Sequence, residues 1–336
     1  MPRITILMPV YNGERFLQET IDSVLAQSYR DFVFLIINDG STDSSAEIIH
    51  SYTDKRIVYH ENEKNIGLVA TLNKGIEIVD TEFLARMDAD DLWHPAKLEK
   101  QIQLLDSRPD VGLCGTSIRK FDAFEGDFIF PVDNEALKVG FLFYCCMSHP
   151  SVVFRMSFLK NSGLRYHADY FPAEDYKMWV ECLEKTQIYN IPEVLVYYRQ
   201  HSNQITQDSN ELQRTQTNKI RLEMLDRISS RFTDEEKKFH LKTFVPQNIH
   251  SVSDYKKCAD WCQLIQLRNN EKRSYISPKV LNQGLNNYLQ AGYKGYVLQK
   301  YFPAFNVIHM FQYLFSAEWR YLSLRRNLSL FYKCIF

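Results

Sequence analysis

The chain has 336 residues, of which 45% are hydrophobic and 24% charged, and its formal net charge is −1. This composition is typical of a soluble globular protein, and the length allows one large domain plus a smaller one or two domains of ordinary size. The near-neutral charge argues against a nucleic-acid-binding protein, which would carry a basic excess. The seven scattered cysteines lack metal-binding spacing, which indicates reduced thiols and predicts a cytoplasmic protein.

Short apolar runs alternate with helical spacings over the first 110 residues. The predicted strands are Ile4–Met8, Phe32–Ile37, Ile57–Tyr59 and Phe83–Met87, and the predicted helices cover 16–25, the region of Ile48 and Ile49, 67–79, and a segment from Pro95. This alternation is typical of a mainly parallel sheet with helices on both faces. Ligands of such sheets bind at the carboxyl ends of the strands.

The pattern changes twice further along the chain. From Val111 it is mixed, with predicted strands at Leu113–Ile118, Ser151–Phe154 and Val194–Tyr198 and a predicted helix over Glu174–Lys185. After about Gln207 only helix signals remain, such as the capping box Thr233–Glu236 and the Ser277-Pro278 helix start. We therefore predict an α/β domain over 1–207, in halves 1–110 and 111–207, followed by a mostly helical region over 208–336.

Asp88-Ala89-Asp90-Asp91 is the most informative short motif. Three carboxylates directly follow a predicted buried strand, and like charges so close together repel one another unless a positive charge lies between them. A hard divalent cation with oxygen ligands, Mg²⁺ or Mn²⁺, meets this need and commonly binds substrate phosphates as well. The alternative is a solvated acidic turn before the helix near Pro95.

Two other strand ends carry polar residues that suit a nucleotide. Asp39, in Asn38-Asp39-Gly40-Ser41, could accept a hydrogen bond from a ring N–H or a ribose hydroxyl. Pro9, Tyr11 and Asn12 follow the first strand and could form a wall of the same pocket. Taken alone, each of these segments is ordinary turn chemistry.

The ordered series of motifs resembles family 2 glycosyltransferases of the GT-A fold. The segments that carry the resemblance are Pro9-Val10-Tyr11-Asn12, Asn38-Asp39-Gly40-Ser41, Asn65-Ile66-Gly67, Asp88-Ala89-Asp90-Asp91, His149-Pro150-Ser151, Ala173–Trp179 and Tyr198-Arg199-Gln200-His201. They lie in order over about the first two-thirds of the chain. Each motif alone is modest, and the ordered set is specific.

The resemblance implies a role for each matching position on the donor side. Asp39 would contact the nucleotide base, with Pro9, Tyr11, Asn12, Asn65 and Gly67 beside it. Asp88 and Ala89 would lie at the ribose and at a metal-bound water. Asp90 would bind the cation, Mn²⁺ or Mg²⁺, that bridges the diphosphate, with Asp88 as a further metal-side residue. His201 would close over the metal or diphosphate, with Arg199 nearby. Asp91 is either a metal ligand or a structural residue of the helix start.

On the acceptor side the resemblance implies that Asp175 is the general base and that its neighbour Glu174 orients the acceptor. Inverting glycosyl transfer needs a carboxylate that takes the proton of the acceptor hydroxyl. This base must lie apart from the metal site, because the two tasks need opposite local charge. His149 and Trp179 would belong to the acceptor side. The alternative for Glu174 and Asp175 is favourable charge at a helix N-terminus.

The sequence thus predicts an inverting, metal-dependent glycosyltransferase. The donor would be a nucleotide-sugar, UDP-linked as first choice, and the acceptor a glycan or lipid-linked glycan in surface-polysaccharide synthesis. A sugar-phosphate nucleotidyltransferase is an alternative, but the first strand lacks the glycine-rich basic loop that it would need. Phosphoryl transfer through Asp88 and Asp90 has little support, and the intact Asp39, Asp88, Asp90 and Asp175 argue against an inactive glycan-binding homologue.

Residues 317–336 are rich in aromatic and basic side chains. If they form a helix, Tyr321, Leu324, Leu328 and Phe331 share one face. Such a face suits peripheral docking on an anionic membrane, which would place the protein at the inner face of the cell membrane. The alternative is a last helix packed on its own domain or on a second subunit of a homo-oligomer. No stretch of the chain approaches the roughly 20 apolar residues that cross a bilayer.

Overall fold

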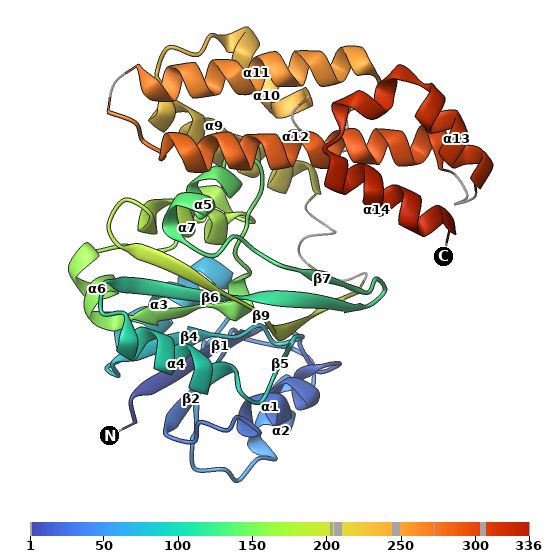
Figure 1. The fold of residues 1–336 in the computed structure, drawn as a ribbon. Helices are drawn as coiled ribbons and strands as arrows, with labels where there is room; N and C mark the ends of the chain where they lie inside the picture. Colours follow the sequence, from blue (N-terminus) through green and yellow to red (C-terminus); the bar gives the residue numbers. More distant parts are fainter. Residues whose placement is uncertain are drawn as a thin grey trace. The chain divides into compact units, whose positions relative to one another are not determined.

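The computed structural model describes residues 2–201, 204, 210–243, 249–271, 273–302 and 307–335. The chain divides into two compact units (Figure 1). Unit 1 consists of Met1–Leu137 and Cys145–Ile220, and unit 2 of Lys138–Tyr144 and Arg221–Phe336. The predicted boundary at residue 207 lies outside the described residues.

The first half of unit 1 contains the predicted parallel strands. β1 (Ile4–Val10), β2 (Phe32–Asn38), β3 (Ile57–Glu61) and β4 (Phe83–Arg86) lie in the order β3-β2-β1-β4, and neighbours are parallel. The helices between and after them are α1 (Leu17–Leu25), α2 (Ser45–His50), α3 (Leu68–Ile78) and α4 (Lys97–Ser107). The predicted α/β fold with a helical C-terminal region is confirmed.

β1 continues two residues beyond its predicted end and includes Pro9. The carbonyl of Leu7 accepts from Met87 on the β4 side, and that of Val10 accepts from Asp39 on the β2 side. Since hydrogen-bonding groups alternate along a strand, the missing N–H of Pro9 lies on the β4 side, where β4 has already ended. A proline is tolerated there because no ladder bond is lost.

The second half of unit 1 makes the sheet mixed. β8 (Val153–Arg155) is antiparallel to both β4 and β6 (Val111–Asp122), while β9 (Gln187–Gln200) runs parallel to β6 and antiparallel to β5 (Leu92–Trp93). β7 (Gly126–Phe128) forms a hairpin with β6. β6 and β9 are longer than predicted because their pairing continues through register shifts into polar residues. Strands from both predicted halves therefore share one sheet.

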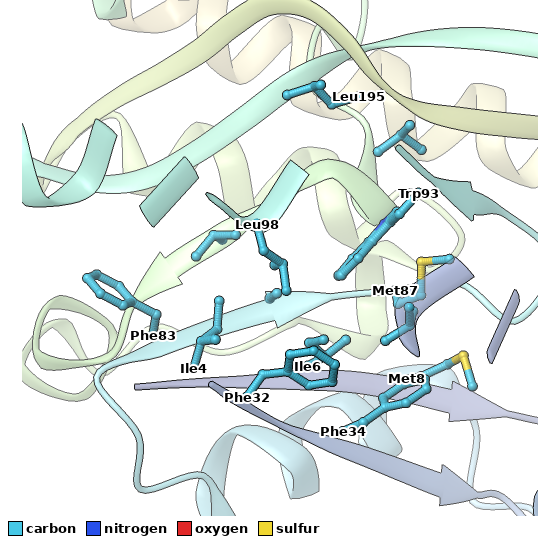
Figure 2. Packing of buried hydrophobic residues seen from close by; sticks show 14 of the residues in the cluster. Ile4, Ile6, Met8, Phe32, Phe34, Phe83, Met87, Trp93, Leu98 and Leu195 are labelled. Atoms are coloured by element: carbon cyan, nitrogen blue, oxygen red, sulfur yellow. The ribbon is translucent and has the colours of Figure 1, made fainter. Parts of the chain in front are cut away.

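One face of this sheet carries an apolar core. Figure 2 shows Ile4, Ile6 and Met8 of β1 packed with side chains of β2, β4, β5, α4 and β9 and with Met87, which follows β4. The labelled partners from these elements are Phe32, Phe34, Phe83, Trp93, Leu98 and Leu195. All of these side chains are almost fully buried. Burying a large apolar side chain contributes about 1.5–3 kcal/mol. The strands whose carboxyl ends carry the polar motifs are thus fixed by a tightly packed apolar core.

Unit 2 is helical, as predicted for the C-terminal region. It contains α10 (Asp234–Thr243), α11 (Val252–Asn270), α12 (Pro278–Tyr301), α13 (Val307–Phe315), the 3₁₀ helix η4 (Ala317–Tyr321) and α14 (Leu324–Ile335). α9 (Asn210–Ile228) runs from one unit into the other. The predicted capping box is confirmed, because Glu236 accepts from the backbone N–H of Thr233 and Thr233 accepts from that of Glu236.

The last predicted helix is interrupted. Leu322, between η4 and α14, is extended and buried, and the backbone N–H of Ser323 donates to Gln290 of α12. Leu322 and Leu330, which do not lie on the predicted amphipathic face, point into the core of unit 2. Of the residues that the structure describes, none belongs to a helix with the length and hydropathy needed to span a bilayer.

Candidate functional site

Asp39 follows β2 and is buried, and both of its carboxylate oxygens accept hydrogen bonds from unit 1. Oδ1 accepts from Asn62 Nδ2 at 2.7 Å and from the backbone N–H of Ile66 at 3.0 Å, and Oδ2 accepts from that of Gly67 at 3.0 Å. Gly40 lets this loop come close, because a Cβ there would lie 2.6–2.8 Å from the backbone of Lys64 and Asn65. Asp39 therefore fixes the 65–67 loop against β2.

The segment after β1 is held to the loop after β2. Asn12 has a φ of 50°, its backbone N–H donates to Ser41 Oγ at 3.0 Å, and its Oδ1 accepts from the backbone N–H of Thr42 at 2.8 Å. The neighbouring Tyr11 side chain is half exposed. Because Asn12 is fixed on both sides, Tyr11 presents its ring to solvent at the carboxyl edge of the sheet, where a base could stack.

Each carboxylate of the 88–91 cluster has a different partner. Asp88 pairs with the buried guanidinium of Arg86, two residues back on β4. Asp90 Oδ2 lies 2.9 Å from His201 Nε2. Asp91 is fully buried, and its Oδ1 accepts from the backbone N–H of Arg199 at 2.8 Å. Burial, with Asp90 and Asp88 nearby, raises the pKa of Asp91 well above its usual range.

Arg199 holds together the elements around Asp90. Its Nε donates to the carbonyl of Asp90 at 2.8 Å, Nη1 donates to Asp122 on β6 at 2.9 Å, and Nη2 donates to Glu19 on α1 at 2.6 Å. The guanidinium also lies over the rings of Phe16 and Phe121. All of these contacts lie inside unit 1. The Arg199 side chain therefore joins the Asp90 loop to β6 and α1.

The Asp90–His201 pair fits a divalent cation. Over the described part of the chain, no three His, Cys, Asp or Glu side chains converge as a complete metal cage. Mg²⁺ in nucleotide sites needs only one or two carboxylates, because substrate phosphates and water supply the other ligands. The side chain of Asp90 is 30% exposed, and Nε2 of His201 lies beside it at the rim of the cluster. Among the described residues, the buried Nδ1 of His201 has no hydrogen-bond partner.

Glu174 and Asp175 form a second acidic group at the start of α7 (Glu174–Cys182). Burial, with Asp175 adjacent, raises the pKa of Glu174 to about 8, and burial raises the pKa of Asp175 to about 6. Glu174 Oε2 is buried and has no hydrogen-bond partner among the residues that the structure describes, whereas Asp175 Oδ1 accepts from the backbone N–H of Tyr176. Burial therefore favours the protonated form of both carboxyls, and more strongly that of Glu174.

Arg86 connects the two acidic groups, and the sequence analysis gave it no role. Its positive charge lowers the pKa of Asp88, Glu174 and Asp175 alike, against the larger effect of burial. The two groups therefore lie within electrostatic range of one guanidinium. An arginine inside a predicted buried strand could have indicated this, because a buried charge needs a partner.

His149 and Trp179 lie behind the second acidic group. Both are buried, with ring centroids 5.7 Å apart in an edge-on arrangement. His149 Nε2 is 2.9 Å from Tyr166 Oη, and burial lowers the pKa of His149 well below its usual range, so the ring is neutral. Trp179 is fully buried beside Phe154 and Tyr166. α7 therefore packs through Trp179 against the rings of His149, Phe154 and Tyr166.

Comparison with known sequences identifies a family of proteins with this arrangement. The sequence model described as Glycosyl transferase family 2 matches residues 5–133. An uncharacterized glycosyltransferase of Haemophilus influenzae is 30% identical over 239 residues, which are 66% of this chain and 73% of the relative. The uncharacterized glycosyltransferase MJ1057 of Methanocaldococcus jannaschii is 31% identical over 208 residues, 59% of this chain and 71% of the relative.

Solved structures show the same fold at low sequence identity. S. aureus TarS 1–349 in complex with UDP-GlcNAc superposes with a TM-score of 0.57 at 15% identity, over 89% of this chain and 93% of that chain. The mannosyltransferase PcManGT from Pyrobaculum calidifontis, in complex with GDP-Man and Mn²⁺, gives a TM-score of 0.53 at 14% identity. The match covers 89% of this chain and 88% of that chain.

Proposed function

The chain belongs to glycosyltransferase family 2, and from this membership we propose that it is an inverting enzyme which uses a nucleotide-diphosphate sugar. The observation that carries the proposal is the division of the carboxylates in unit 1. Asp88 pairs with Arg86 and Asp90 with His201, while Glu174 and Asp175 have no such pair among the described residues and burial raises the pKa of both. One group suits a cation and a diphosphate, and the other suits proton transfer.

Asp175 takes the proton of the acceptor in this mechanism. The acceptor oxygen forms a bond to the anomeric carbon as its proton passes to the Asp175 carboxylate, and the bond from that carbon to the diphosphate oxygen breaks. A pKa raised to about 6 makes Asp175 a stronger base than a solvated aspartate, and it remains ionised at neutral pH. Glu174, mostly protonated, donates a hydrogen bond to orient the acceptor.

Asp90 and His201 would hold Mn²⁺ or Mg²⁺ at the diphosphate. The cation supplies Lewis-acid stabilisation of the negative charge on the leaving nucleoside diphosphate. Asp88, which pairs with Arg86, would contact the ribose, with Ala89 beside it. Asp39 would contact the base, with Pro9, Tyr11, Asn12, Asn65 and Gly67 beside it. Arg199 contributes by fixing the backbone of Asp90.

A UDP-linked sugar is the first choice of donor, and the acceptor is a hydroxyl of a glycan or a lipid-linked glycan in polysaccharide synthesis, such as capsule or lipopolysaccharide. The support for the donor class is that similar folds bind UDP-GlcNAc in TarS and GDP-Man with Mn²⁺ in PcManGT. A lipid-linked acceptor would place the enzyme in the cytoplasm, at the inner face of the membrane.

Thermal unfolding with nucleotides tests the donor and the cation together. We expect UDP with Mn²⁺ to raise the Tm, and UDP with EDTA to raise it much less. Slow hydrolysis of a panel of nucleotide-sugars then identifies the donor. Stabilisation by UTP with a sugar phosphate, in place of UDP, would instead favour the nucleotidyltransferase. A protein that binds glycans but hydrolyses no donor would be an inactive homologue.

A further inference from the structure

Exposed apolar side chains gather on the last helices of unit 2. Eight of the eighteen exposed large hydrophobic residues in the described part of the chain lie between 308 and 332. They form what we call the C-terminal apolar surface: Ile308, Phe311, Leu314, Phe315, Trp319, Leu324, Leu328 and Tyr332. Phe315 is 89% exposed and Leu324 74% exposed. Exposed apolar side chains concentrated in one segment of a chain often mark an interaction site.

This surface is separate from the residues that build the interior of unit 2. Tyr313 of α13 is fully buried and donates to Asn327 of α14 at 2.8 Å, and Asn327 donates to the carbonyl of Trp319 at 2.9 Å. Leu322 and Leu330 are buried as well. α13 and α14 therefore contact each other through their inner faces, and their outer apolar residues are additional to what packing needs.

The charges beside the surface are positive. Arg320 of η4 and Arg325 of α14 are exposed. Glu318 is the only acidic residue in the sequence between 307 and 335, and it already accepts from Lys300 at 2.7 Å and from Tyr296 at 3.2 Å. Apolar and aromatic side chains next to exposed arginines, with no exposed acid among them, match the interfacial layer of an anionic bilayer.

We propose that the C-terminal apolar surface docks unit 2 on an anionic lipid bilayer. This surface includes residues of α13 as well as of η4 and α14. The inference deepens the proposed function, because a membrane-bound enzyme can reach a lipid-linked acceptor. A second copy of the chain fits this surface less well. In a symmetric dimer the same patch faces itself, so Arg320 and Arg325 would meet like charges without an acidic partner.

The test is co-sedimentation of the full chain with vesicles of phosphatidylcholine alone or with added phosphatidylglycerol. We expect binding to the anionic vesicles. Replacing Ile308, Phe311 and Phe315 by Ser should weaken partition at least about tenfold, because three apolar anchors are lost. Arg320→Gln with Arg325→Gln should weaken binding to anionic vesicles by about fivefold for each arginine. Leu267→Ser, at another exposed apolar residue of unit 2, should bind like the parent chain.

The outcome is independent of catalysis. Stabilisation by UDP with Mn²⁺, measured on each variant, reports whether the chain is folded and whether its donor site is intact. A parent chain that binds vesicles without responding to any nucleotide would contradict the proposed function alone. A parent chain that stays in the supernatant, or an Ile308/Phe311/Phe315 variant that binds as well as the parent, would overturn the docking proposal. Self-association that the same substitutions abolish, without vesicle binding, would overturn it in favour of a second copy.

Discussion

The two acidic groups of unit 1 differ in the partners of their carboxylates. In the 88–91 cluster Asp88 meets a guanidinium, Asp90 an imidazole and Asp91 a backbone N–H. At the start of α7, Glu174 has a buried oxygen without a partner and Asp175 accepts only from a backbone N–H among the hydrogen bonds described. A cationic partner favours the ionised form of a carboxyl, whereas burial, which also raises the pKa of Asp88 and Asp91, favours the protonated form.

This contrast shows that the role of an aspartate depends on how its charge is compensated. A partnered carboxylate can exchange its partner for a metal ion. A carboxylate with a raised pKa can accept a proton near neutral pH. The following substitutions test the contrast, in order from the largest expected effect to the smallest.

Asp90→Asn should abolish the Mn²⁺-dependent part of UDP stabilisation and reduce transfer by at least about a thousandfold. The substitution removes a proposed metal ligand. The metal would stabilise the negative charge on the leaving diphosphate, an effect worth several kcal/mol. Thermal unfolding and initial rates measure the two effects. Asp80→Asn, at a 96% exposed side chain, is the matched control. If the Asp90→Asn protein still responded to Mn²⁺, the metal would have to bind at other residues.

Asp175→Asn should lower kcat for transfer by about a hundred- to a thousandfold, because proton transfer by a positioned base contributes that much. UDP stabilisation should stay unchanged, since the second acidic group does not bind the nucleotide. In the parent enzyme kcat/KM should fall as the pH drops below about 6, where Asp175 becomes protonated. Unchanged acceptor-dependent transfer in Asp175→Asn would rule this residue out as the base.

Arg86→Met should destabilise the protein by about 3 kcal/mol, because it leaves Asp88 with an uncompensated charge near buried groups. Urea unfolding measures the loss, and adding Asp88→Asn should recover part of it. The control is Arg3→Met, whose partners Glu82 and Asp106 are largely exposed, so its loss should stay below about 1 kcal/mol. Equal losses for both variants would mean that Arg86 does not connect the two groups.

Glu174→Gln should stabilise the protein, and more so as the pH rises. The pKa of Glu174 is about 8 in the folded chain against an ordinary 4.5, so between these values the folded state binds the extra proton and stability falls with increasing pH. Removing the acid removes that loss, so the gain in stability grows as the pH rises through this window. Unfolding at pH 5 and 9, with the exposed Glu63→Gln as control, measures it. A pH-independent effect would show that Glu174 is not buried as a protonated acid.

Much of the fold followed from local patterns. The four parallel strands, the helices after them and the capping box at Thr233 depend on residues close together in the chain. The positions of the motifs at strand ends follow from the same periodicity. Proposed roles such as those of Asp90, His201 and Asp175 came from the ordered motifs, and they stay predictions.

What the sequence did not reveal are contacts between distant residues. The partners of Asp39 are supplied by the 62–67 segment, and those of Arg199 come from α1, β6 and the Asp90 loop. Such contacts depend on the register of β9 beside β5 and β6, which includes shifts that no short-range pattern encodes. The break at Leu322 likewise depends on Gln290, more than thirty residues earlier.

The distance along the chain between the acidic cluster and its partners has a consequence for synthesis. Asp90 and Asp91 leave the ribosome long before Arg199 and His201, which are 108 and 111 positions away from the carboxylates they contact. Until β9 has emerged and joined the sheet, Asp90 and Asp91 lack these two contacts. The end of β9 and the residue after it therefore complete the partners of the acidic cluster.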